Sequence, residues 1–301
     1  MTAIARTHAP AASPRPRRDR GGRFLVPALL ILGLTSIYPT AYSVWMSLFD
    51  WNWGQRLNFV GLQNYLDLAV SERSRTALWN TIVFTIGAVS VEFVLGLGLA
   101  VVVSQLGVGR GIIRTLLLVP LMVGGMIVSV IWKIMLDPTL GIVGTSLQRL
   151  GFPPMGFLGD PGMAMASIIA IDTWWQTAFV FIVLAAGIQA LPAEPFEAAE
   201  VDGASAFQRF TNLTLPLLRP TILVVLMFRT VDCLKVFAII FGTTGGGPLT
   251  TTESVQVLAY RVAFKQLNMS VSMTTMVVFS VFAVLVLVAY QRLLPTTERI
   301  E

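Results

Sequence analysis

The chain has 301 residues, of which 55% are hydrophobic and 12% are charged. This composition is typical of a membrane protein and excludes a soluble globular fold. The formal net charge of +5 comes largely from the N-terminal tail and short loops, so it indicates topology in a lipid membrane and no nucleic-acid partner. The apolar runs predict one all-α polytopic membrane domain with six transmembrane helices.

The single cysteine and the single histidine limit the available chemistry. Cys233 lies in an apolar run and cannot form an intramolecular disulfide. His8 lies in the N-terminal tail, which excludes histidine-based catalysis or a histidine metal site within the membrane. No Gly-Lys pair occurs in the sequence, so the chain has no Walker A motif, and its glycine-rich run at 242–248 is not a phosphate-binding loop.

Residues 1–23 are rich in proline, alanine and arginine and predict a disordered basic cytoplasmic tail. The arginines directly precede residues 24–49, the first expected span, which is longer than a signal-peptide core of about 7–15 residues. This charge placement predicts an N-terminus inside the cell. Residues 50–78 are mixed polar and aromatic, and we expect an external loop with one or two short helices.

The second expected span covers residues 79–105. Gly96 and Ala100 form a step of small residues that lets another helix approach closely. Glu92 places a charge within this span. Its carboxylate either lines a polar pathway through the membrane or forms a hydrogen bond with a neighbouring helix, and we favour the helix contact.

Residues 111–136 form the third expected span, in which Pro120 and the Gly124-Gly125 pair predict a kink or tight packing. An external loop follows at 137–161, and the fourth span is expected at 162–190. This span contains Trp174, Trp175 and Gln176.

These three residues have two interpretations. Aromatic faces beside an amide suit a sugar ring, whose C–H face stacks on the aromatic group while its hydroxyls take hydrogen bonds. Alternatively, the tryptophans belong to an aromatic belt at the membrane interface.

Residues 191–218 are the one long polar interruption that predicts a helix–turn–helix between two membrane spans. Glu194–Val201 contains good helix formers with a proline in the first turn, where a missing N–H costs nothing. The Asp202-Gly203 pair ends this helix. A second short helix is expected at 204–212, and we expect Pro216 to stop the stretch. Helices this short are not stable alone in water, which indicates a partner protein.

The fifth expected span, residues 219–241, is the most charged. Arg229, Asp232 and Lys235 occur at three-residue spacing on one helix face. They form either a self-paired cluster that fixes helix packing or a polar lining for a hydroxylated solute. The sequence leaves both interpretations open.

An external loop is expected at 242–254, a short surface helix at 255–268 and the sixth span at 269–294. Residues 295–301 would then be a cytoplasmic C-terminal tail. Several basic residues contradict a simple positive-inside distribution, because this topology places them outside: Arg56, Arg73, Arg75, Arg261 and Lys265.

Within the polar stretch, the order Glu-Ala-Ala, three residues, Gly, nine residues and Leu-x-Leu-Pro resembles the EAA loop of binding-protein-dependent ABC sugar importer permeases. The run FVGLQNYLDL at 59–68, TGGGP at 244–248 and AYRVAF at 259–264 extend the resemblance. Two positions depart from the family, which usually has Ile where Leu213 stands and often Pro where Ala178 stands. The residues carried over as the ATPase-coupling segment are Glu197, Ala198, Ala199, Asp202, Gly203, Phe207, Leu215 and Pro216.

The resemblance implies a fold like that of type I ABC importer permeases, in the bacterial cytoplasmic membrane, with both termini cytoplasmic. It also implies a second, non-identical permease, two copies of a cytoplasmic ATPase and an extracytoplasmic solute-binding protein. The chain itself would be no enzyme and would bind no cofactor or metal, with ATP and Mg²⁺ on the partner ATPase. The implied mechanism is alternating access, in which ATP binding opens the spans outward and hydrolysis resets them.

The substrate expected from the resemblance is a disaccharide or short oligosaccharide, and a polyol or glycerol phosphate is the alternative. A rival of another class is an ion-coupled secondary transporter. It would need an intramembrane ion site, for which the only carboxylates are Glu92, Asp172 and Asp232. It would leave the EAA loop unexplained. A membrane enzyme would need a catalytic constellation that the sequence lacks.

Overall fold

The computed structural model describes residues 22–53 and 55–293, and these residues are mostly helical. The chain divides into two compact units, Met1–Ser43 and Val44–Glu301. The cytoplasmic tails expected at 1–23 and 295–301 lie outside the described residues, except that Gly22 and Arg23 begin the first helix.

The first apolar run is helical with a local widening. α1 (Gly22–Leu32) continues through a π-helical turn, η1 (Gly33–Ile37), into α2 (Tyr38–Met46). Residues Leu25–Met46 together are long and apolar enough to cross a membrane. The helix therefore ends three residues before the expected boundary at 49, because Phe49 begins a strand.

A small hairpin follows the first run, and the sequence did not predict it. β1 (Phe49–Asp50) pairs antiparallel with β2 (Asn58–Phe59). The short helix expected in this loop is α3 (Gln63–Val70). The Asn64 amide donates to the carbonyls of Ser47 and Phe49, both at 2.8 Å, so α3 is fixed to the hairpin.

The second unit is built around a pair of long helices, α4 (Glu72–Gln105) and α8 (Ala164–Gln189). α4 begins earlier than expected because Ser71 caps it, its hydroxyl accepting the N–H of Ser74 at 3.3 Å. A Cβ on Gly96 would lie 2.6 Å from Cγ1 of Val180 on α8, and Ala100 is fully buried. The predicted close approach at this small-residue step is confirmed.

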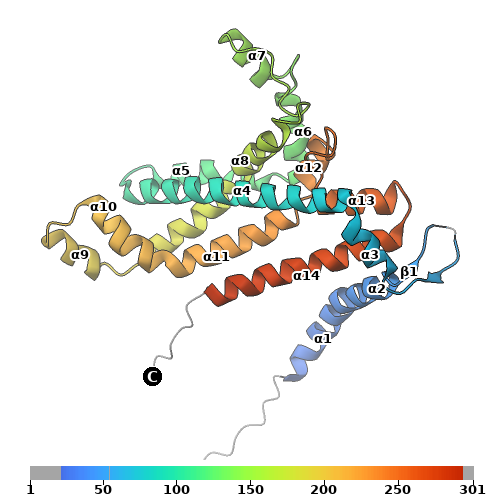
Figure 1. The fold of residues 1–301 in the computed structure, drawn as a ribbon. Helices are drawn as coiled ribbons and strands as arrows, with labels where there is room; N and C mark the ends of the chain where they lie inside the picture. The colour runs from blue at the N-terminus through green and yellow to red at the C-terminus, as the bar shows by residue number, and fades with distance from the viewer. Residues whose placement is uncertain (1–21, 54, 294–301) are drawn as a thin grey trace, which may run out of the picture. The chain divides into compact units, whose positions relative to one another are not determined.

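The third expected span is broken. α5 (Arg110–Leu118) leads through a 3₁₀ turn, η2 (Pro120–Met122), to α6 (Gly125–Met135), and the two halves meet at 94°. The predicted kink at Pro120 and Gly124 is therefore confirmed. In the following loop α7 (Ile142–Arg149) stands apart from the other helices (Figure 1).

The polar stretch folds as α9 (Glu194–Val201) and α10 (Ala206–Arg209), with a capping box at Ser205 and Gln208. A π-helical turn, η3 (Phe210–Thr214), then runs directly into α11 (Leu215–Leu234). The expectation that Pro216 stops the stretch is wrong. It lies in the first turn of α11, where a proline N–H is not needed.

The fifth expected span is not one helix. α11 ends at Leu234, residues 235–237 are non-helical, and α12 (Ala238–Thr243) follows. The last two elements are α13 (Val255–Phe264) and α14 (Met269–Leu293), close to the expected helices at 255–268 and 269–294.

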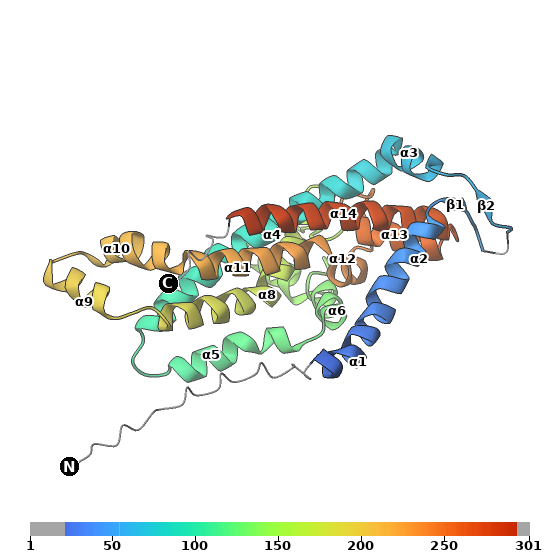
Figure 2. The same ribbon diagram turned by 90° about the horizontal axis from the view of Figure 1, so that it is seen from below.

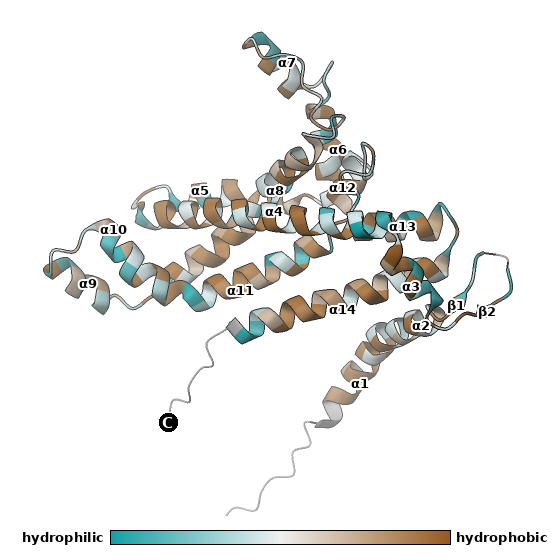
Figure 3. Cartoon of the chain, viewed as in Figure 1, coloured by the Kyte–Doolittle hydropathy of each residue, from teal (hydrophilic) through white to brown (hydrophobic). Residues whose placement is uncertain are grey.

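Figures 1 and 2 show α4, α8, α11 and α14 running side by side. The buried core between α4, α8 and α11 is continuous with residues of α6 and α12. Hydrophobic residues cover the long helices, whereas hydrophilic ones gather in α9, α10 and the hairpin segment (Figure 3).

Fewer than six helices of the described residues meet the length and composition expected of a membrane span. Four helical segments of the described residues are long and apolar enough to cross a membrane, or five if the bent α5–α6 pair counts as one span. The difference lies in α11, whose 20 residues include Arg219, Arg229 and Asp232. The expected count of six is not confirmed.

Candidate functional site

A buried ion cluster joins the three central helices. Arg229 on α11 donates from Nε and Nη2 to the two carboxylate oxygens of Glu92 on α4, at 2.6 and 2.9 Å. Its Nη2 also donates to Oδ2 of Asp172 on α8 at 2.9 Å. Within α11, Nη1 donates to Oδ2 of Asp232 at 2.6 Å. One guanidinium therefore ties α4, α8 and α11 together.

The members of this cluster differ in exposure. The Glu92 side chain is 0% exposed and that of Asp172 is 6% exposed, whereas that of Asp232 is 61% exposed. Charges buried without a partner are strongly unfavourable, so Glu92 and Asp172 depend on Arg229 for compensation. Asp232 is the member of the cluster that reaches open space.

The open space beside the cluster is a cavity of about 300 Å³ between α4, α8 and the α11–α12 break. Most of the intramembrane candidates meet here. The cavity is lined by Phe84, Asp172, Trp175, Gln176, Arg229, Asp232, Cys233, Lys235, Val236, Phe237, Ala238 and Ile239. The non-helical residues 235–237 supply part of this lining.

The three residues of the Trp-Trp-Gln run on α8 do not share one environment. Trp175 and Gln176 line the cavity, whereas Trp174 does not, and its ring meets Trp132 edge-on at 5.5 Å. The indole N–H of Trp175 donates to the carbonyl of Val123 at 2.9 Å, at the break between η2 and α6. Trp175 thus presents its ring to the cavity while its polar atom is already bonded.

Glu92 and Lys235 differ in their placement. Glu92 does not line the cavity, because it lies behind Arg229 and meets the neighbouring helix. Lys235, at the end of α11, is exposed and lines the cavity, and its side chain makes no hydrogen bond or ion pair within the described residues. The three charges expected on one helix face therefore divide into a bonded pair and an open ammonium group.

Glu92, Asp172 and Cys233 are also close enough for their ligand atoms to surround a metal ion. However, the guanidinium of Arg229 lies among them, 2.9 Å from Asp172 Oδ2 and 3.2 Å from Cys233 Sγ. This cation already supplies the positive charge that a metal would bring. The geometry is that of an arginine-centred cluster.

The segment expected to couple to an ATPase forms a separate surface at the far end of α8 and α11. None of the residues of α9 is buried, and Gly203 ends the helix with φ +76°. The Gly203 N–H donates to the Glu200 carbonyl at 3.1 Å, and the Ala204 N–H donates to the Ala199 carbonyl at 2.9 Å. A side chain at Gly203 would meet no neighbouring atom, so only the backbone conformation requires glycine there.

A groove of about 490 Å³ lies between this segment and the ends of α4 and α8. Phe196, Glu197 and Phe210 line the groove. Phe207 does not line the groove and is 74% exposed, so it does not share the environment of Phe210. Glu197, Ala198 and Asp202 are exposed, whereas Ala199 is half-buried.

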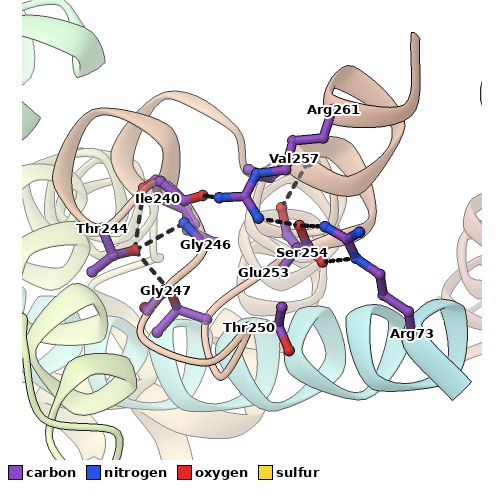
Figure 4. A network of polar contacts seen from close by, with 12 residues as sticks. Arg73, Ile240, Thr244, Gly246, Gly247, Thr250, Glu253, Ser254, Val257 and Arg261 are labelled. Atoms are coloured by element: carbon purple, nitrogen blue, oxygen red, sulfur yellow. Dashed lines mark hydrogen bonds and ion pairs between the residues drawn. The ribbon is translucent and has the colours of Figure 1, made fainter. Parts of the chain in front are cut away.

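Sequence reasoning missed a third buried carboxylate, Glu253. Glu253, 1% exposed, accepts Nε and Nη2 of Arg73 on α4, both at 2.8 Å, and Nη1 of Arg261 on α13, also at 2.8 Å. Arg261 also donates to the carbonyl of Gly245, so it fixes the glycine-rich loop (Figure 4). The sequence did contain a signal for this carboxylate. Several basic residues were expected at the outer face without an explanation, and two of them, Arg73 and Arg261, form ion pairs with Glu253.

Comparisons with known proteins identify the family. The family described as binding-protein-dependent transport system inner membrane component matches residues 92–297. The trehalose/maltose transport system permease protein MalF of Thermococcus litoralis is 37% identical over 241 residues, which are 80% of this chain and 82% of that protein. The trehalose transport system permease protein SugA of Mycobacterium tuberculosis is 33% identical over 270 residues, 87% of this chain and 84% of that protein.

A solved structure shares the fold. It is the crystal structure of a bacterial ABC transporter involved in the import of the acidic polysaccharide alginate, with a TM-score of 0.82 at 22% identity. The match covers 92% of this chain and 96% of that chain. The resemblance inferred from the polar stretch is confirmed. The chain belongs to the binding-protein-dependent transport system inner membrane component family, as the transmembrane permease of an ABC sugar importer.

Proposed function

We propose that the chain is one of two non-identical permease subunits of an ATP-driven importer for a disaccharide or short oligosaccharide. The α9–α10 pair carries the proposal. It lies outside the helix bundle, has exposed apolar side chains and matches the EAA pattern from Glu197 to Pro216 except at Leu213, where the family usually has Ile. A short helix pair of this kind requires a surface to dock on.

That surface is a cytoplasmic ATPase subunit, present in two copies that bind the ATP and Mg²⁺. Glu197 and Ala198 face outward on α9, and the small side chain of Ala198 permits close approach. Gly203 ends α9 so that α10 can turn back, and Val201 and Phe207 provide exposed apolar area for the contact. Movement of this docked pair would be transmitted through η3 into α11, because the two are continuous.

The cavity beside Arg229 is where the solute binds. Trp175 offers an aromatic face, and Gln176, Asp232 and Lys235 offer polar groups around it. A volume of about 300 Å³ lies at the lower end for ligand sites, so we expect the second permease to complete the site. The curated relatives named for trehalose and maltose favour a disaccharide, and a polyol or glycerol phosphate is the alternative.

The topology follows from this assignment. Residues 24–294 form the permease domain, and the coupling segment at 191–218 lies in the cytoplasm with both termini. The opposite face, which holds the hairpin and the glycine-rich loop, meets the solute-binding protein. An ion-coupled transporter is disfavoured, since two of its three possible carboxylates, Glu92 and Asp172, are buried against Arg229.

The testing experiment is a detergent pull-down of the chain from its native membranes. Wild type is compared with Gly203→Asp and with Gly151→Asp, which has a similar backbone at φ +90° and also meets no neighbouring atom. We expect wild type and Gly151→Asp to bring down an ATPase and a second permease, and Gly203→Asp to lose the ATPase alone.

Wild type that comes down without an ATPase, or Gly203→Asp that keeps every partner, contradicts the proposal. Uptake into cells provides an independent check on the energy source. Uptake that continues with an uncoupler while ATP is maintained supports ATP coupling, and uptake that stops supports the secondary transporter.

A further inference from the structure

The guanidinium of Arg229 has almost no capacity left for a ligand. An arginine has five N–H donors in a fixed fork. Nε and Nη2 are used by Glu92 and Asp172, and one donor of Nη1 is used by Asp232. Recognition of a phosphate or carboxylate by arginine is commonly bidentate, and it requires two parallel free donors. Arg229 cannot offer them without breaking a buried ion pair.

The charges around the cavity do not favour an anion either. Two carboxylates, Asp172 and Asp232, line the cavity beside two cations, Arg229 and Lys235, and Arg229 is further neutralised by Glu92 behind it. Lys235 is the one cation here without a bonded partner in the described part of the chain. A flexible ammonium is a point charge with no fixed geometry, and it lies three residues from the exposed carboxylate of Asp232.

The polar groups that remain available suit hydroxyls. One oxygen of Asp232 is bonded to Arg229, and the other makes no hydrogen bond within the described residues, so it is a charged acceptor open to the cavity. Gln176 is only 8% exposed, yet its amide has no hydrogen-bond partner in the described structure. A buried amide without a partner is unfavourable unless a ligand or water satisfies it.

We propose that this cavity selects an uncharged polyhydroxyl solute and rejects phosphorylated or carboxylated ones, with Asp232 as the specificity-determining acceptor and Arg229 as its positioning residue. This inference rests on the proposed function, since it assigns the substrate class of the same site. The Asp232 carboxylate attracts a sugar hydroxyl and repels an anion, because like charges placed together across a binding site are unfavourable. Gln176 supplies a donor and an acceptor for a second hydroxyl.

The test measures solute binding to the permease in the absence of the solute-binding protein, which could itself select the solute. The assembled permease–ATPase complex is placed in lipid nanodiscs, and saturation-transfer NMR is recorded with trehalose, maltose and trehalose 6-phosphate. We expect the better of the two neutral disaccharides to bind at least about tenfold more tightly than trehalose 6-phosphate, as one like-charge contact implies.

Variants distinguish the contribution of Asp232 to solute binding from that of Lys235. Asp232→Asn is nearly isosteric and exposed, so gel filtration should show an intact complex. It should weaken the neutral sugar about tenfold, the loss expected for a hydrogen bond to a charged group, and should reduce the discrimination against trehalose 6-phosphate. Asp232→Glu should restore part of the neutral-sugar binding. Lys235→Gln should retain the preference for the neutral sugar.

Trehalose 6-phosphate that binds wild type as tightly as the neutral sugars, with Lys235→Gln abolishing that binding, overturns the inference by making Lys235 an anion site. Binding of neither neutral sugar also overturns it. These results are distinct from failure of the proposed function, which would appear as loss of ATP-dependent uptake of any carbohydrate and as an intact pull-down in Gly203→Asp.

Discussion

Replacing Arg229 by methionine should strongly destabilise the permease. The substitution keeps most of the side-chain volume but removes the cation that compensates Glu92 and Asp172. Breaking a buried ion pair by deleting one partner costs about 3–5 kcal/mol. The pair with Asp232 adds less than about 1 kcal/mol, because that carboxylate is largely exposed.

A loss of about 4 kcal/mol corresponds to a fall in the melting temperature of about 10 °C for a chain of this size. The assay heats the detergent-solubilised importer and measures the remaining monodisperse fraction by fluorescence-detected gel filtration. Lys235→Met is the matched control, since it removes an exposed cation near the same end of α11. It should shift the melting temperature by less than about 2 °C.

A second variant tests the cause. The triple change Glu92→Gln, Asp172→Asn and Arg229→Met removes the buried charges together, and it should recover at least half of the lost stability. An Arg229→Met variant that melts within about 2 °C of wild type would refute the reasoning. A triple variant no more stable than Arg229→Met would show that packing and not charge causes the loss.

Three further predictions follow from local geometry. Gly96→Ala places a Cβ 2.6 Å from Val180 and should cost about 1–3 kcal/mol in thermal unfolding, whereas Gly98→Ala meets no atom and should be neutral or stabilising. Glu253→Gln should lower stability by about 1–3 kcal/mol through the loss of the charged partner of Arg73 and Arg261, with Glu72→Gln as an exposed control. The pKa of the Asp137 carboxyl lies below the ordinary value of 3.8. The cause is that its charged form accepts hydrogen bonds from the Leu140 N–H, the Thr139 hydroxyl and the Thr139 N–H. The stability of that turn is fully present above pH 3.8 and is lost as the pH falls through the lower folded pKa, so the NMR shift of the Asp137 carboxyl carbon should have its midpoint below 3.8.

The sequence predicted well those elements whose ends are marked by residues that favour the start or the end of a helix. α9 begins at Glu194 and ends at Val201 as expected, because a first-turn proline and the Asp-Gly pair mark both ends. The close α4–α8 contact followed from Gly96 and Ala100, since small residues at this spacing have few other uses in a membrane helix. The break near Pro120 was also predicted from local residues, namely Pro120 itself and the Gly124-Gly125 pair.

The candidate site depended on long-range pairing, which a single sequence does not reveal. Glu92 and Arg229 are 137 positions apart, and each was visible only as an isolated intramembrane charge. The break at 235–237 contains neither glycine nor proline, so the sequence predicted one helix over residues 219–241. The wrong role for Pro216 has a different cause: proline both ends and begins helices, and local pattern does not decide between them.

Cys233 is the only thiol in the sequence, and it is buried against Arg229. Cys233 lines the cavity but is only 2% exposed, so separation of α11 from α8 at the junction that Arg229 holds closed would make its sulfur more accessible to a maleimide reagent. The wild-type protein therefore contains a natural thiol probe at the ion cluster that joins its three central helices. The rate of thiol modification, compared with and without ATP, reports directly whether that junction opens during turnover.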